Sequence, residues 1–194
     1  MDESTLTNSE NDSFYSRDTI NTISDSEISE VEKPDFSLPK LITSIANVLM
    51  EIIQENKINA NASYIIKDYF YSRRIAKISL EDYIKRIVNY TNIEIPTLIS
   101  SVMYIDKLCE NNSYILCNNN IHRIVLSAIV VSTKMNEDKH CNNGHFAKIG
   151  GVSVEEMNNL EYTLCSYLDY NLYILPDNYD KYEKFFRSCQ CKAI

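Results

Sequence analysis

Four residues within the stretch 138–145 have side chains that can bind a metal ion or take part in catalysis. They are Asp138, His140, Cys141 and His145. Structural zinc sites usually present such ligands in closely spaced pairs, and this stretch lacks that spacing. Cys141 and His145 could also act as a nucleophile and its base, but the sequence supplies no orienting acid or oxyanion hole for them. We therefore predict no metal site, no cofactor and no catalysis.

The C-terminal end holds a cysteine that could be chemically modified. Cys191 is followed by Lys192, Ala193 and Ile194, which places a thiol at the distance from the end that prenylation requires. Lys192 stands where an aliphatic residue is usual, so a coincidental tail is the favoured interpretation and membrane attachment the weaker one.

The charge of the 194-residue chain is concentrated at its N-terminal end. Residues 1–38 hold ten acidic and two basic side chains, which accounts for the whole formal charge of −8. The other 156 residues are electrically balanced, and their Lys and Arg residues are scattered. Nucleic-acid-binding domains usually gather positive charge on one face, so no nucleic-acid partner is predicted.

Residues 1–38 are also poor in apolar side chains. Such a segment cannot bury enough surface to offset the entropy lost on ordering, and we predict a disordered acidic tail. Thr22, Ser24 and Ser29 each precede an acidic residue by three positions, a pattern that acidophilic kinases favour. A phosphorylated tail and a merely solubilising leader both fit this composition.

The compartment follows from the cysteines and the N-terminus. Six cysteines occur in a chain whose first residues lack the apolar core of a signal peptide. This combination is typical of a reducing compartment, so cytoplasm or nucleus is expected. No apolar run approaches the ~20 residues of a membrane-spanning helix.

Turn-forming residues are scarce, which predicts an all-α fold. The chain has four prolines and three glycines, and a sheet protein of this length would need more turns. Ser79 with Asp82 predicts a capped helix start, and Pro96 suits the first turn of another helix. In chain order, helices are expected over 39–57, 62–72 (one short turn), 79–90, 96–109 and 121–135, near 146, from 153, and weakly over 177–188.

The segment 120–175 has the most distinctive order of elements. Residues 121–135 are apolar on every side, which suits a helix surrounded by others, and Asn120 is predicted to cap it. An Asn, Gly and Lys run follows at 142–151, and Ser153 with Glu156 then forms the pattern of a capping box. This order, with the two helices upstream, resembles the cyclin family, in particular the single-box P-type (U-type) cyclins.

The resemblance implies a domain organisation around a five-helix cyclin box. The stretch after residue 175 is too short for the second five-helix repeat of many cyclins. The expected parts are a disordered tail (1–38), an N-terminal helix and connector (39–78), the cyclin box (79–175) and a C-terminal extension (176–194).

The resemblance also implies a function and a site. Cyclins are regulatory subunits that bind and activate cyclin-dependent Ser/Thr protein kinases, and are not enzymes themselves. The family's charged kinase contacts fall on Lys134 and Glu161, for which solvated helix caps are the structural alternative. Its apolar kinase-facing positions fall on Val131, Met135, Tyr170 and Leu172, for which core packing is the alternative.

Two further family features concern the first box helix. An internal ion pair of the family falls on Arg86 and Asp106. The apolar groove that docks substrates in cell-cycle cyclins is expected to be absent, because Lys85 and Asn89 occupy it. Other functions that such a fold allows are a transcription-factor or nucleic-acid module and a scaffold without a kinase.

Overall fold

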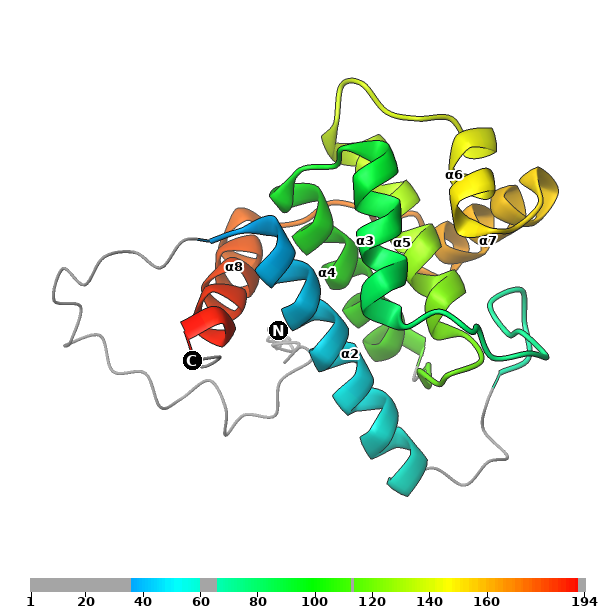
Figure 1. Ribbon diagram of the computed structural model, residues 1–194, viewed down its shortest axis with the longest axis horizontal. Helices are drawn as coiled ribbons and strands as arrows, with labels where there is room; N and C mark the ends of the chain where they lie inside the picture. Colours follow the sequence, from blue (N-terminus) through cyan, green and yellow to red (C-terminus); the bar gives the residue numbers. More distant parts are fainter. Residues whose placement is uncertain (1–35, 60–65, 113, 192–194) are drawn as a thin grey trace, which may run out of the picture. The chain divides into compact units, whose positions relative to one another are not determined.

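The computed structural model describes residues 36–59, 66–112 and 114–191, with backbone alone at 59, 190 and 191, and this part of the chain is helical without a strand (Figure 1). The prediction of an all-α fold is confirmed. Residues 1–35 of the predicted acidic tail, which include Thr22, Ser24 and Ser29, lie outside the described residues. The side chain of Cys191 also lies outside them. The helices are α2 (Leu38–Asn59), α3 (Leu80–Thr91), α4 (Ile95–Asn112), α5 (Ile121–Asn136), α6 (Asn143–Gly150), α7 (Val154–Tyr167) and α8 (Pro176–Cys191). None of these helices combines the length and apolarity needed to cross a membrane.

Helix α5 is the centre of the fold. It contacts α3, α4, α6 and α7, and eleven of its sixteen residues are buried. Its buried hydroxyl groups are satisfied within the protein, as Ser132 donates to the carbonyl of Thr97 at 2.6 Å and Thr133 donates to that of Ile129 at 2.7 Å. A buried polar group without such a partner would be costly. The prediction that 121–135 forms a surrounded helix is confirmed.

Side-chain caps begin two of the helices as predicted. The Ser79 hydroxyl accepts a hydrogen bond from the Asp82 amide at the start of α3, and Ser153 accepts one from the Glu156 amide at the start of α7, both at 3.0 Å. Asn120 occupies the predicted N-cap position of α5, but its side chain makes no capping hydrogen bond. Instead, its buried side chain accepts from the Cys117 amide at 2.8 Å and donates to the Ile115 carbonyl at 2.9 Å, which braces the turn before α5.

The connector before α3 holds its position without a helix. Residues 66–72 contain a bend and turn at 68–70 and no helix, so that part of the helical turn expected over 62–72 is wrong. Residues 62–65 lie outside the described range. The Asp68 carboxylate accepts hydrogen bonds from the hydroxyls of Tyr114 and Tyr167 and from the amide of Phe70. An aspartate that bonds the backbone two residues on favours a turn over a helix.

Helix α8 is packed more fully than the weak terminal helix expected over 177–188. It lies beside α2 and also contacts α4 (Figure 1). Phe186 is fully buried, and the Tyr182 hydroxyl donates a hydrogen bond to the carboxylate of Asp106 in α4. Helices from both ends of the described chain therefore cover the central helices.

Gly150 permits the close approach of α6 to α5. A β-carbon at this position would lie 2.4 Å from the Leu126 Cδ2 atom, and Leu126 is fully buried. The Tyr83 hydroxyl also donates to the Gly150 carbonyl at 3.1 Å, which fixes the glycine from the other side. No side chain fits here unless the core moves.

We expect Gly150→Ala to lower the free energy of unfolding by ~1–3 kcal/mol, the usual cost of overpacking a core. Urea denaturation followed by circular dichroism measures the change. Lys148→Ala is the control, because Lys148 is an exposed residue of the same helix and should change stability by less than ~0.5 kcal/mol. Equal effects of the two substitutions would contradict the assigned contact with Leu126.

Candidate partner-binding site

Lys134 and Glu161 are brought together from two helices. Lys134 lies in the last turn of α5, where the helix dipole favours a cation, and Glu161 lies in α7. The Lys134 Nζ atom is 2.6 Å from Glu161 Oε1, and the two side chains are 30% and 22% exposed. The pair is therefore partly shielded from water but still reaches the surface.

Asn143, which we did not single out from the sequence, completes this arrangement. Its side-chain amide donates to Glu161 Oε2 at 2.6 Å and to the Asn158 side chain at 2.7 Å. Both carboxylate oxygens of Glu161 are thus held. The only advance signal was the position of Asn143 in the Asn and Gly run, which did not specify its partner.

The pair can bind acceptor groups of another molecule. An ammonium group has three donor hydrogens, and the contact with Glu161 is the one hydrogen bond that Lys134 Nζ makes among the described residues. Burial raises the pKa of the nearby Cys165 thiol, and Glu161 adds to this shift while Lys134 opposes it. Burial and the Glu161 charge thus both disfavour the thiolate form of Cys165.

Two of the four predicted apolar contact residues are well exposed. Met135 is 53% exposed and Tyr170 is 61% exposed, whereas Leu172 is half-buried. Val131 does not contribute to this surface, because it is only 2% exposed and α5 is surrounded by other helices at that point. For Val131, core packing describes its environment.

The structure adds Tyr162 to this exposed surface. Tyr162 follows Glu161 in α7 and is exposed. The pKa of Tyr170 is raised by desolvation and then by the charge and hydrogen bonding of Tyr162, so the two hydroxyls lie near each other. We refer below to Lys134, Met135, Glu161, Tyr162, Tyr170 and Leu172 as the Lys134–Glu161 surface.

The segment after α7 is anchored to α4, which positions part of this surface. Tyr104 donates its hydroxyl hydrogen to the Leu172 carbonyl at 2.8 Å, and Lys107 Nζ donates to the Asn171 carbonyl at 2.6 Å. Tyr170 itself has a positive φ of 54°. A non-glycine residue with positive φ is uncommon, and the two anchors beside Tyr170 restrain this turn.

The structure does not bring Arg86 and Asp106 together. Arg86 is exposed on α3, while Asp106 is 2% exposed and accepts the hydrogen bond from Tyr182 of α8. Arg86 and Asp106, both of which the structure describes, do not form an ion pair with each other. The role expected of Arg86, to partner a carboxylate of α4, is filled by the Tyr182 hydroxyl.

The potential metal ligands of 138–145 lie around the α5–α6 loop. Asp138 and His140 are exposed, and the His145 Nε2 atom lies 2.9 Å from the Tyr90 carbonyl. Across the described part of the chain, no three His, Cys, Asp or Glu side chains gather as a metal ion would require.

Comparison with known proteins identifies the family. The sequence model of the cyclin family matches residues 39–172, which includes most of α2, all of α3–α7 and the Lys134–Glu161 surface.

Three relatives illustrate the type of cyclin. Cyclin-U4-1 of Arabidopsis thaliana is 24% identical over 82% of this chain and 80% of its own length. Cyclin-P3-1 of Oryza sativa subsp. japonica is 25% identical over 80% of this chain and 66% of its own length. PHO85 cyclin-7 of Saccharomyces cerevisiae is 25% identical over 76% of this chain and 60% of its own length.

These matches agree with the geometry. The five helices α3–α7, with α5 in the middle, are consistent with a cyclin box, and α2 is the additional N-terminal helix. The match to U-type, P-type and PHO85 cyclins narrows the assignment within the family. The chain belongs to the cyclin family and is of its P/U type.

Proposed function

We propose that this chain is the regulatory subunit of a cyclin-dependent Ser/Thr protein kinase, which it binds through the Lys134–Glu161 surface and activates. Membership of the cyclin family supports a regulatory role. One relative is named as a cyclin of PHO85, which supports a partner of the kinase class. The transfer of phosphate from ATP belongs to that partner.

The observation that carries the proposal is the half-buried Lys134–Glu161 pair with exposed apolar neighbours. Each charged residue is followed in sequence by an exposed apolar or aromatic one, Met135 after Lys134 and Tyr162 after Glu161. Exposed apolar side chains that gather at one place are typical of a partner interface. The central ion pair would fix the orientation of the partner, because the remaining donor hydrogens of Lys134 require acceptors at fixed positions.

Binding of the chain would activate the kinase by positioning the kinase's catalytic elements. An active protein kinase needs its Lys–Glu ion pair and its activation loop in place, and a bound subunit can stabilise that arrangement. Interfaces of permanent complexes bury upward of ~2,000 Å² in total. The Lys134–Glu161 surface is therefore the centre of a larger contact, and its removal should have a large effect.

Reconstitution tests the proposal. The full chain is isolated with its native partners, these are identified by mass spectrometry, and the kinase found is purified alone. Adding the chain in equal amount should increase phosphate transfer to a Ser/Thr peptide, while the chain without kinase transfers none. A native complex that lacks a kinase, or a kinase whose rate the chain leaves unchanged, would contradict the proposal.

A further inference from the structure

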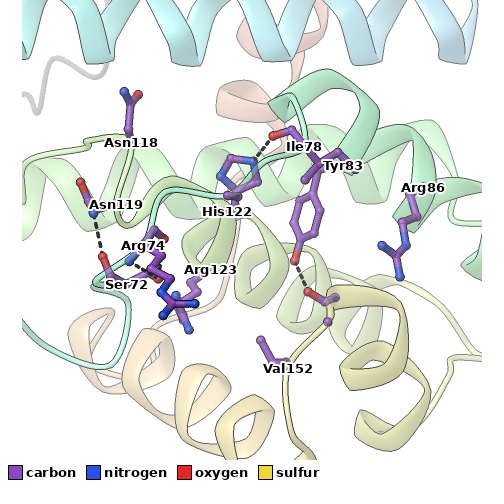
Figure 2. A pocket seen from close by; sticks show the side chains of 13 residues that line it. Ser72, Arg74, Ile78, Tyr83, Arg86, Asn118, Asn119, His122, Arg123 and Val152 are labelled. Carbon is purple, nitrogen blue, oxygen red and sulfur yellow. Dashed lines mark hydrogen bonds between the residues drawn. The ribbon is translucent and has the colours of Figure 1, made fainter.

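A pocket of about 210 Å³ lies at the other end of α5 from Lys134. Its walls come from the connector before α3, from α3, from the turn before α5 and the first turn of α5, and from the turn between α6 and α7 (Figure 2). The proposed kinase contact uses none of the residues that line this pocket. What it binds is therefore a separate question.

The pocket is lined by three arginines and by no acidic residue. Arg74 comes from the connector, Arg86 from α3 and Arg123 from α5. Arg123 is neutralised in part, because its Nε and Nη2 atoms lie 2.8 and 2.5 Å from Glu156 Oε1. Arg74 and Arg86 form no salt bridge with any described residue, so the pocket keeps uncompensated positive charge within a domain that is neutral as a whole.

The electrostatic effect of two of these arginines is visible at Tyr83. Burial raises the pKa of the Tyr83 hydroxyl above its usual value, while the charges of Arg86 and Arg123 shift it in the opposite direction. Both guanidinium charges therefore act on the Tyr83 hydroxyl, with Arg86 on one side of its ring and Arg123 on the other (Figure 2), while the Glu156 carboxylate raises the pKa.

The backbone around the pocket is held in place before any ligand arrives. The Ser72 hydroxyl donates to the Arg74 carbonyl at 2.7 Å, and Ser72 is bonded to Asn119 in both directions, through the Asn119 side-chain amide and through its own amide (Figure 2). On the opposite wall, the Tyr83 hydroxyl fixes Gly150. Such preorganisation lowers the entropic cost of binding.

His122 supplies a further polar wall. Its Nε2 atom lies 3.1 Å from the Ile78 carbonyl, so Nε2 carries the proton, whereas the buried Nδ1 has no hydrogen-bond partner among the described residues. Burial lowers the pKa of this ring, which favours its neutral form.

We propose that this pocket binds a phosphate monoester group through Arg74, Arg86 and Arg123. Guanidinium groups match the oxygen geometry of phosphate and bind it with paired hydrogen bonds. Clusters of arginine are a recurrent means of recognising phosphorylated side chains. A pocket of 210 Å³ is smaller than the ~300–1,000 Å³ of sites for drug-sized ligands, so it suits a phosphate on a short side chain or a small molecule.

Isothermal titration of the full chain tests this, with N-acetyl-phosphoserine amide and inorganic phosphate as the two probes. We expect saturable binding of the phosphoserine probe, weakened at least tenfold by Arg74→Ala and by Arg86→Ala, each of which removes a charged hydrogen-bond donor. Both residues are exposed, so both variants are expected to fold, and an unchanged melting temperature would verify this. Arg73→Ala is the matched control, because Arg73 is exposed and adjacent but does not line the pocket.

Each outcome of the titration either distinguishes the two possible sources of the phosphate group or contradicts the proposed site. Tighter binding of the phosphoserine probe than of inorganic phosphate supports a phosphorylated protein segment as ligand, and equal binding supports a small phosphorylated molecule. No binding, or a loss with Arg73→Ala as large as with Arg74→Ala, would overturn the proposal. The kinase is absent from this experiment, so its result does not depend on the proposed function.

Discussion

Lys134→Met is expected to raise the Kd of the complex with the partner kinase by roughly 30-fold or more, with Glu161→Ala close behind. Methionine keeps the length of the side chain and removes the charge, so Glu161 is left without its 2.6 Å partner at the interface. Truncating one member of a charge pair that binding buries costs about 2 kcal/mol or more, which corresponds to the stated factor. Surface plasmon resonance with the immobilised kinase measures the effect.

Lys85→Met is the matched control for this experiment. Lys85 forms an ion pair of similar length with Glu81, at 2.7 Å, but within α3 and away from the proposed contact. Its substitution should leave the Kd unchanged within a factor of about two, because exposed pairs contribute little. If Lys134→Met folds normally and binds as tightly as the wild type, the kinase contact lies elsewhere.

A charge exchange separates the stability of the pair from its role in recognition. Lys134→Glu combined with Glu161→Lys restores opposite charges and should keep most of the unfolding free energy. The donor then projects from α7 and the acceptor from α5, so kinase binding should remain weak. Recovery of wild-type affinity in the double variant would show that the pair is structural only.

Phe186→Ala should lower the free energy of unfolding by ~3–5 kcal/mol, the range measured when a buried phenylalanine is truncated. Phe186 is fully buried in the core, with an accessible fraction of 0%. Helix α8 joins α2 and α4 through such contacts and through the bond from Tyr182 to Asp106. Since small domains are stable by only ~5–15 kcal/mol, this change would unfold a large share of the protein on mild heating.

Lys184→Ala provides the comparison for Phe186→Ala, because Lys184 is an exposed residue two positions away on the same helix. Its effect should stay within ~0.5 kcal/mol. Thermal denaturation of both variants, followed by circular dichroism, measures the difference. A loss of less than ~1 kcal/mol for Phe186→Ala would mean that α8 is a detachable extension, as its polar composition first indicated.

Local patterns were sufficient for the helical elements. The Ser79 and Ser153 caps depend on residues three positions away, and the burial of α5 follows from an apolar surface on every side. The resemblance of the 120–175 segment to cyclins also used residues that are close in the chain. Such features are encoded within one or two turns of helix, so they can be predicted without knowledge of distant contacts.

Predictions that depended on a distant partner were less successful. Arg86 and Asp106 were expected to pair, but Tyr182, 76 positions beyond Asp106, binds that carboxylate instead. Val131 was expected on the partner surface, but helices that approach α5 from several sides bury it. Asn120 is a different case, because it stands at the N-cap position and the turn just before it, not a distant element, engages its side chain.

The amino-acid order alone decided the helical class, the start of the capped helices and the position of the most buried helix, because periodicity and capping act over a few residues. Only the tertiary structure decided that Asn143 holds Glu161 against Lys134, that α8 belongs to the core, and that Arg74, Arg86 and Arg123 line the same pocket. These groups come from elements far apart in the chain, and they become neighbours only when the apolar faces of those elements are buried against one another.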